Sequence, residues 1–137
     1  MNVAALMDEI GTALSTVPGL RVHPFQAKRV TPPSALIGLP DSYTFDATYG
    51  RGSDRLSLPV LVVVGGVSDR ASRDQLARYA DGAGTHSVKS AIESGDYAEA
   101  DTVVVSSVEF PGVRIADLDY LAASFTVDVL GPGGVMQ

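Results

Sequence analysis

Two histidines are the residues of this chain best suited to acid–base or metal chemistry. His23 lies in an expected short strand, and His86 lies just before an expected helix. A metal site needs several ligands, but the other candidates are scattered aspartates, and neither the HExxH motif nor another metal-ligand spacing occurs. The chain has no cysteine, which excludes disulfides, thiolate zinc sites and cysteine nucleophiles. We therefore expect both histidines to have structural or surface roles.

Two further segments carry groups that enzymes use. Asp117 and Asp119 lie two residues apart where a loop enters a strand; such a pair can hold a cation or act as an acid/base pair, but is more often part of a solvated loop. Gly65-Gly66-Val67-Ser68 lies between a strand and a helix, as phosphate loops do, yet GxxxxGK[ST] and GxGxxG are both absent. A GxSxG hydrolase motif is absent as well. We predict no catalytic residue, no metal and no cofactor, in a protein that is not an enzyme.

The chain of 137 residues has the composition of one globular domain. Apolar residues make up 45% and charged residues 19%, which is enough to build a sizeable core. We expect a single domain over residues 1–130 and a flexible tail over residues 131–137. No apolar run approaches the roughly 20 residues of a membrane-spanning helix. The first residues lack the basic and apolar regions of a signal peptide, so we expect synthesis in a cytoplasm.

The net charge of −6 is unevenly distributed. Residues 1–78 hold 8 basic and 7 acidic side chains, whereas residues 79–137 hold 2 basic and 9 acidic ones. A nucleic-acid-binding protein is expected to carry a basic face that attracts phosphates, and this chain has no basic run. The acidic C-terminal half therefore argues against nucleic acid or an anionic membrane as a direct ligand.

Apolar periodicity predicts three helices and six strands. The strands come in runs and several have one polar face. We therefore expect an α+β fold, with a mostly antiparallel or mixed β-sheet, helices packed on one face, and the order α-β-β-β-β-α-α-β-β. The predicted helices span residues 3–17, 70–81 and 87–94, and the predicted strands span residues 20–23, 35–39, 43–49, 56–64, 102–110 and 120–130.

The most strongly patterned segment is a hairpin over residues 43–64. Its second strand carries alternating apolar residues from Leu56 to Val64 and ends at Gly65-Gly66, before a helix that Ser68 or Asp69 can cap. A glycine-rich turn is expected over residues 50–54. In the first strand, the residues predicted to form the buried face are Tyr43, Phe45, Ala47 and Tyr49.

Two loops and one helix are candidate partner contacts. The loop Pro24–Pro33 is long for a small domain, and the tip Gly50–Arg55 carries two arginines, which can form bidentate bonds to carboxylates. Both loops can equally be plain connections. The arginines of the helix that starts at residue 70 can equally form a solvated face paired with aspartates. The predicted interface residues are Lys28, Arg29, Arg51, Asp54, Arg55, Arg70 and Arg73.

This arrangement resembles the tail terminator proteins of long-tailed bacteriophages, the family also described as minor tail protein U or tail completion protein. The resemblance covers most of the chain and rests on patterns rather than on a diagnostic motif. The segments that carry it are the N-terminal amphipathic helix over residues 3–17, the strand opening Gly19-Leu20-Arg21-Val22, the apolar strand over residues 56–64, the helix segment Asp74-Gln75-Leu76-Ala77-Arg78-Tyr79, residues 84–92 and the closing strand over residues 120–129.

The resemblance implies a structural virion protein located at the head–tail interface and assembled in the bacterial host cytoplasm. Such a protein forms a homo-oligomeric ring, commonly a hexamer, that caps the tail tube, stops its polymerisation and offers a surface for head joining. The implied partners are the tail tube protein and a head completion or stopper protein, with DNA passing through the lumen without specific binding and with no membrane. The alternatives are another head–tail connector or tail-tube protein and, in a different class, a small-ligand-binding α+β domain or enzyme.

Overall fold

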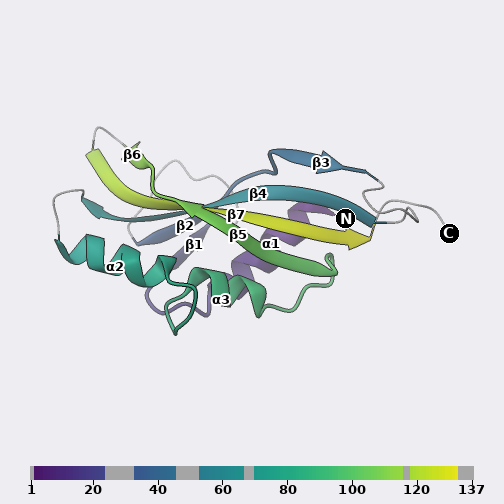
Figure 1. Ribbon diagram of the computed structural model, residues 1–137, viewed down its shortest axis with the longest axis horizontal. Coiled ribbons are helices and arrows are strands. Elements are labelled where there is room, and N and C mark those ends of the chain that lie inside the picture. Colours follow the sequence, from purple (N-terminus) through teal and green to yellow (C-terminus); the bar gives the residue numbers. More distant parts are fainter. Residues whose placement is uncertain (1, 24–32, 46–52, 67–69, 116–117, 133–137) are drawn as a thin grey trace.

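Two long antiparallel strands, β4 (Ser53–Gly66) and β7 (Leu118–Pro132), form the middle of a seven-stranded sheet. Leu56 pairs with Val129 and Val60 pairs with Phe125, so the apolar residues of both strands share one face. This register explains why both strands alternate in sequence, since one face must be buried and the other is left open. The computed structural model describes residues 2–23, 33–45, 53–66, 70–115 and 118–132 (Figure 1).

A broken strand runs along the outer side of β4. Its two parts are β2 (Ser34–Ile37) and β3 (Ser42–Thr44), both antiparallel to β4. Between these parts the chain stays attached to β4, because Gly38 N donates to Pro59 O at 2.9 Å. A short strand, β1 (Arg21–His23), pairs with β2 in parallel and forms the edge on this side.

A second broken strand runs along the outer side of β7. It consists of β5 (Thr102–Glu109) and β6 (Gly112–Ile115), both antiparallel to β7. Phe110 and Pro111 separate the two parts, and proline lacks the N–H that a ladder needs. The strand order is therefore β1-β2-β4-β7-β5, with β3 attached to β4 and β6 attached to β7.

In the described part of the chain, three helices cover one face of this sheet (Figure 1). They are α1 (Val3–Leu14), α2 (Arg70–Ala80) and α3 (Val88–Glu93). Helix α2 packs on β4 and β7, α3 packs on β5, and α1 packs on β2 and α3. The largest fully buried side chains of the resulting core include Tyr79, Phe125, Leu6, Ile10, Leu14, Ile37 and Ile92. Burying each of these aliphatic or aromatic side chains contributes about 1.5–3 kcal/mol.

Local signals set the starts of two helices. Asn2 precedes α1, and its side chain accepts a hydrogen bond from Ala5 N at 3.1 Å. Ser87 precedes α3 in the same way, accepting from Ser90 N at 3.1 Å, and its hydroxyl also donates to Asp81 O at 2.6 Å. Capping satisfies backbone donors that the first turn leaves unpaired. No helix in the described part of the chain is long and apolar enough to cross a membrane.

The α+β fold class is confirmed, as are the mostly antiparallel sheet and the helices on one face. Three details of the prediction are wrong. Strand β6 was not predicted, because Pro111-Gly112 was interpreted as the end of a strand rather than as a break within one. Strand β3 ends at Thr44, and Phe45 is 73% exposed rather than buried. Gly131 and Pro132 belong to β7, opposite Asp54 and Ser53, and not to a flexible tail.

Several predicted features lie outside the described residues. These are the loop over residues 24–32, the hairpin residues 46–52, the capping positions Ser68 and Asp69, Asp117, and the tail from residue 133.

Candidate interaction surface

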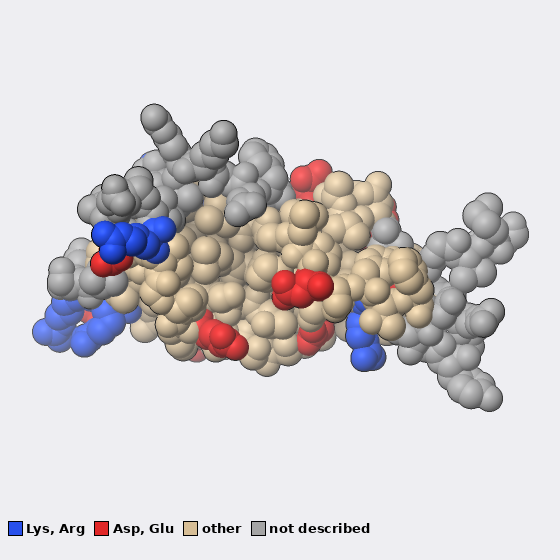
Figure 2. Space-filling view, turned by 90° about the horizontal axis from the view of Figure 1, so that it is seen from above, with Lys and Arg blue, Asp and Glu red and all other residues tan. Residues whose placement is uncertain are grey.

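The face of the sheet opposite the helices carries small polar and apolar side chains. On the central strands this face is formed by pairs such as Ser57 with Asp128, Pro59 with Thr126 and Leu61 with Ser124. Figure 2 views the molecule from this side: uncharged residues make up most of the described surface, acidic side chains lie near its middle and lower edge, and most of the visible Lys and Arg side chains lie at its left end. We refer to this surface as the open face.

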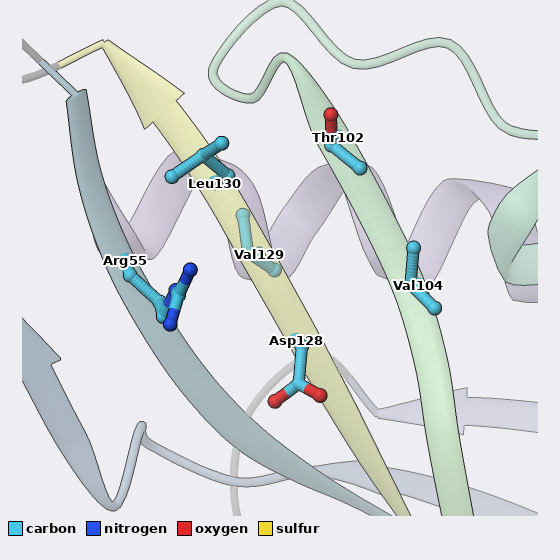
Figure 3. Close-up of a pocket in the computed structure, with 6 residues that line it drawn as sticks. All are labelled: Arg55, Thr102, Val104, Asp128, Val129 and Leu130. Carbon is cyan, nitrogen blue, oxygen red and sulfur yellow. The ribbon is translucent and has the colours of Figure 1, made fainter. Parts of the chain in front are cut away.

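One hollow on the open face combines opposite charges with apolar walls (Figure 3). Its volume is about 380 Å³, and it extends over β4, β7 and β5. Arg55 enters it from β4 and Asp128 from β7, and the two form no ion pair with one another. The Asp128 carboxylate instead accepts a hydrogen bond from the Ser57 hydroxyl. The remaining lining residues are Thr102, Val104, Val129 and Leu130.

A second hollow on the open face is almost entirely apolar. Its volume is about 320 Å³, and it lies where β2 gives way to the Gly38–Asp41 break. Gly38 allows the chain to approach Pro59 closely, since a Cβ at this position would lie 2.8 Å from Pro59 Cγ. Leu39 at its rim is 72% exposed. We call this hollow the apolar groove; it is lined by Leu36, Ile37, Gly38, Leu39, Pro59, Leu61 and Ser124.

A third hollow, of about 210 Å³, lies beside an irregularity in β5. The pairing with β7 shifts between Val105 and Ser107. At this point Val105 N donates to Glu93 Oε2 at 2.9 Å, and Lys89 Nζ lies 2.6 Å from Glu93 Oε1. The hydrogen bond from Lys89, aided by that from Val105, holds the pKa of Glu93 below its ordinary value. A side-chain carboxylate thus occupies a backbone donor of the edge strand, which hinders pairing with another strand there.

Among the described residues, those considered as candidates for chemistry do not converge; Asp117 lies outside this part of the chain. His23 lies in β1, while His86 packs near Tyr79, with the ring centroids 6.4 Å apart. Asp119 lies in β7, where Arg114 Nη1 approaches its Oδ1 at 3.9 Å. Among the described residues, no group of three or more His, Asp or Glu side chains is placed to hold a metal ion.

Three of the predicted interface residues lie on the surface. Arg55 is exposed on the open face, and Arg70 and Arg73 are exposed on α2. Arg73 Nη2 lies 3.1 Å from Asp74 Oδ1, so part of the helix face is paired as the alternative interpretation expected. Lys28, Arg29 and Arg51 lie outside the described residues.

Asp54 does not occupy the exposed turn position that the sequence suggested. It belongs to β4, is only 2% exposed, and accepts a hydrogen bond from the Tyr43 hydroxyl at 2.7 Å. Burial and this bond to Asp54 raise the pKa of Tyr43 to about 12. Asp54 therefore ties β3 to the start of β4.

Sequence analysis missed the exposed apolar residues. Leu39, Phe45, Val104 and Phe110 are large and hydrophobic yet exposed. Their positions in the sequence could have indicated two of them, because Leu39 and Phe110 each come directly before a proline at a break in a strand. Exposed apolar residues that gather on one surface mark contact sites more often than isolated ones do.

No model of a known protein family matches this chain, and a search of curated proteins gives no match. Function must therefore be inferred from the residues of the chain itself.

Proposed function

We propose that this protein is a phage tail terminator: a subunit of a ring that caps the tail tube, stops its polymerisation and provides the surface to which the head joins. The proposal takes the protein to be a structural component of the virion and not an enzyme. Its partners are other copies of itself, the tube protein and a head completion protein. DNA passes through the ring without specific binding.

The observation that carries the proposal is a difference in charge between two regions at opposite ends of the long strands. Helix α2 follows the end of β4 and exposes Arg70, Arg73 and Arg78. The segment that leads into β5 carries Asp96, Glu99 and Asp101, with no basic residue between positions 94 and 101. These regions lie at opposite ends of the long strands (Figure 1). The acidic segment leads to Thr102, which pairs with Leu130, and Leu130 pairs with Arg55 near the start of β4. Helix α2, by contrast, comes after the end of β4.

A subunit that joins a tube on one side and a head on the other needs two end surfaces that differ. Opposite charges at the two ends supply such a difference and select one orientation during docking. A ring subunit also needs lateral surfaces, and it needs no active site. The hollows on the open face are shallow and shared by several strands, which suits side chains of a partner protein.

A mass measurement in solution combined with negative-stain imaging tests the proposal. We expect ring-shaped oligomers that weaken as salt rises, because exposed charges are screened over roughly 8–10 Å near physiological ionic strength. Expression in a terminator-deficient phage should restore normal tail length. A protein that stays monomeric at high concentration and low salt, with and without tail tubes, would contradict the proposal.

A small-ligand-binding protein is the second candidate, favoured by one hollow. Arg55, Thr102 and Asp128 offer a cation, a hydroxyl and a carboxylate within about 380 Å³. A zwitterionic metabolite would match these groups. Calorimetric titration with free amino acids tests this alternative; saturable heat that disappears with Arg55→Ala would support it over the ring.

A further inference from the structure

We propose that copies of this chain contact one another side by side, with Phe110 of one copy inserted into the apolar groove of the next copy. This inference deepens the proposed ring and rests on it, since it assigns the lateral surfaces that such a ring requires. Each copy would use two different patches, the groove on the open face and Phe110 at the β5 edge. Such a heterologous contact leaves both patches available for further copies.

The two patches lie at the same level along the strands: the groove lies on the open face from β2 across β4 to Ser124 of β7, and Phe110 follows β5, the strand beyond β7. Pairing runs across the five strands in one row, in which Leu36 at the apolar groove pairs with Leu61, Leu61 with Ser124, and Ser124 with Glu109. Phe110 directly follows Glu109 and is 60% exposed. A neighbouring copy held at the same level along the strands, with its β5 edge against the β2 side of the open face, therefore brings its Phe110 to the groove.

The shapes of the two patches are complementary. Phe110 is a protruding aromatic side chain at the break between β5 and β6. The groove lies at the equivalent break between β2 and β3, and Ser124 is its only polar lining side chain. Energetic centres of protein interfaces are large side chains, most often Trp, Tyr or Arg, that fill well-packed pockets, and Phe110 would fill the groove in the same way.

The charges of the two patches are also complementary. Glu109 lies beside Phe110 and is exposed, while Arg21 is exposed on β1 at the opposite edge. Within the described part of the chain, neither side chain forms an ion pair. His23 pairs with Leu36, so the row of paired residues that contains Glu109 at one edge has His23 at the other edge, two residues from Arg21. Glu109 thus places one anion beside Phe110, and Arg21 places one cation on the edge that borders the apolar groove.

The contact proposed here uses side chains rather than a continuous sheet. Val105 N on the outer side of β5 is already bonded to Glu93 at 2.9 Å. A strand from a neighbouring copy would have to displace this carboxylate before it could pair with β5 at that point. Phe110 and Glu109 lie beyond this obstruction and stay accessible.

Cysteine cross-linking provides a direct test, because the natural chain has no cysteine. Two variants, Phe110→Cys and Leu39→Cys, are purified separately, mixed and oxidised. We expect a disulfide-linked heterodimer from the mixture and little dimer from either variant alone, since a disulfide needs Cα atoms within about 7 Å. The matched control is Phe45→Cys mixed with Leu39→Cys; Phe45 is even more exposed than Phe110, at 73% against 60%, and follows β3 instead of β5.

Sedimentation of non-cysteine variants gives a second readout. Phe110→Ala should weaken self-association by about 10-fold or more, whereas Phe45→Ala should leave it unchanged. Glu109→Arg and Arg21→Glu should each weaken association, and the double variant should regain part of the loss. Circular dichroism verifies that every variant is folded.

The outcomes separate this contact from the function. If rings form but no heterodimer exceeds the control, the side-by-side contact is wrong while the terminator proposal stands. Dimerisation of Phe110→Cys alone, as the main product, would also overturn the contact, since it indicates a symmetric arrangement. If cross-linking succeeds but the protein fails to restore tail length, the contact stands and the terminator function falls.

Discussion

Glu9 and Ala98, far apart in the chain, are joined by a hydrogen bond of 2.6 Å from the Ala98 amide to Glu9 Oε2. The second oxygen of the same carboxylate accepts from Glu99 N at 3.0 Å. One side chain on α1 therefore holds two consecutive amides of the segment that leads into β5. This segment carries Asp96 and Asp101 at the acidic end of the molecule, so Glu9 positions part of the proposed docking surface.

Replacing Glu9 with alanine should destabilise the fold. Two backbone amides would lose a charged acceptor, and bonds of this type contribute about 1.5–3 kcal/mol each when well shielded, so we expect a total loss of about 1–3 kcal/mol at this half-buried site. Urea unfolding measures the change. Asp8→Ala is the control, because Asp8 is exposed on the same helix; an equal loss for both variants would show that the two amides do not depend on Glu9.

Two tyrosines should ionise late. Burial and the Asp54 carboxylate raise the pKa of Tyr43 to about 12, and burial together with Glu9 raises that of Tyr97 to about 12. Below pH 10 both are protonated in the folded and unfolded chain, so their contribution to stability is complete. Between pH 10 and about 12 the unfolded chain ionises first, and the folded state loses stability.

The ultraviolet absorbance of tyrosinate follows this titration. Tyr43→Phe and Tyr97→Phe should each remove one late-ionising group from the curve. If the late phase persists unchanged in both variants, it belongs to other residues.

Glu93 should contribute stability that is lost in acid. Its pKa in the folded protein lies below the ordinary value of 4.5 because Lys89 and Val105 N donate to it. The contribution is present above pH 4.5 and disappears as the pH falls through the lower value of the folded state. Thermal unfolding of Glu93→Gln should therefore differ from wild type near neutrality and converge with it in acid. Asp96→Asn, at an exposed position, should track wild type throughout.

Reversing the arginines at the hairpin should impair assembly but not folding. Arg51→Glu with Arg55→Glu places two carboxylates where cations can meet acidic partners, and Arg55 lines an exposed hollow of the open face. Each exposed pair contributes only about 0–1 kcal/mol, but a closed ring repeats it at every subunit. Complementation of a terminator-deficient phage measures the effect. Normal tail lengths and full infectivity with this double variant would mean that the hairpin end makes no essential contact.

The helices and long strands could be predicted because their sequences repeat with a single period. The start of α1 follows from Asn2 and from the apolar spacing after it, and β7 follows from its own alternation of side chains. Both signals lie within one element. The breaks within strands are harder to predict from the sequence, because a proline such as Pro111 can either end a strand or interrupt it. Which of these occurs depends on whether β7 extends far enough to pair with β6. Asp54 illustrates a further limit: its polar surroundings suggested an exposed turn, yet Tyr43 makes its burial favourable.

The proposed contact depends on information that no single segment contains. Glu109 and Leu36 share a row only because three successive strand pairings have a particular register, and β5 and β4 each contain an irregularity that shifts it. A shift of one residue would move every side chain of a strand to the other face. In the sequence alone, Phe110 is therefore one apolar residue among many, and nothing there marks it as exposed.

The carboxylate of Glu93 has one more consequence, which concerns how assembly ends. An edge strand with all its outward amides free can add identical strands indefinitely, as amyloid fibrils do. With Val105 N occupied, a neighbouring copy that approaches this point of the edge contacts it through side chains, whose packing fixes an angle between the two molecules. Where that angle divides a full turn and adds no rise along the axis, the copies return to their starting point after a set number of subunits, so a chain proposed to limit the length of a tail would also limit its own growth.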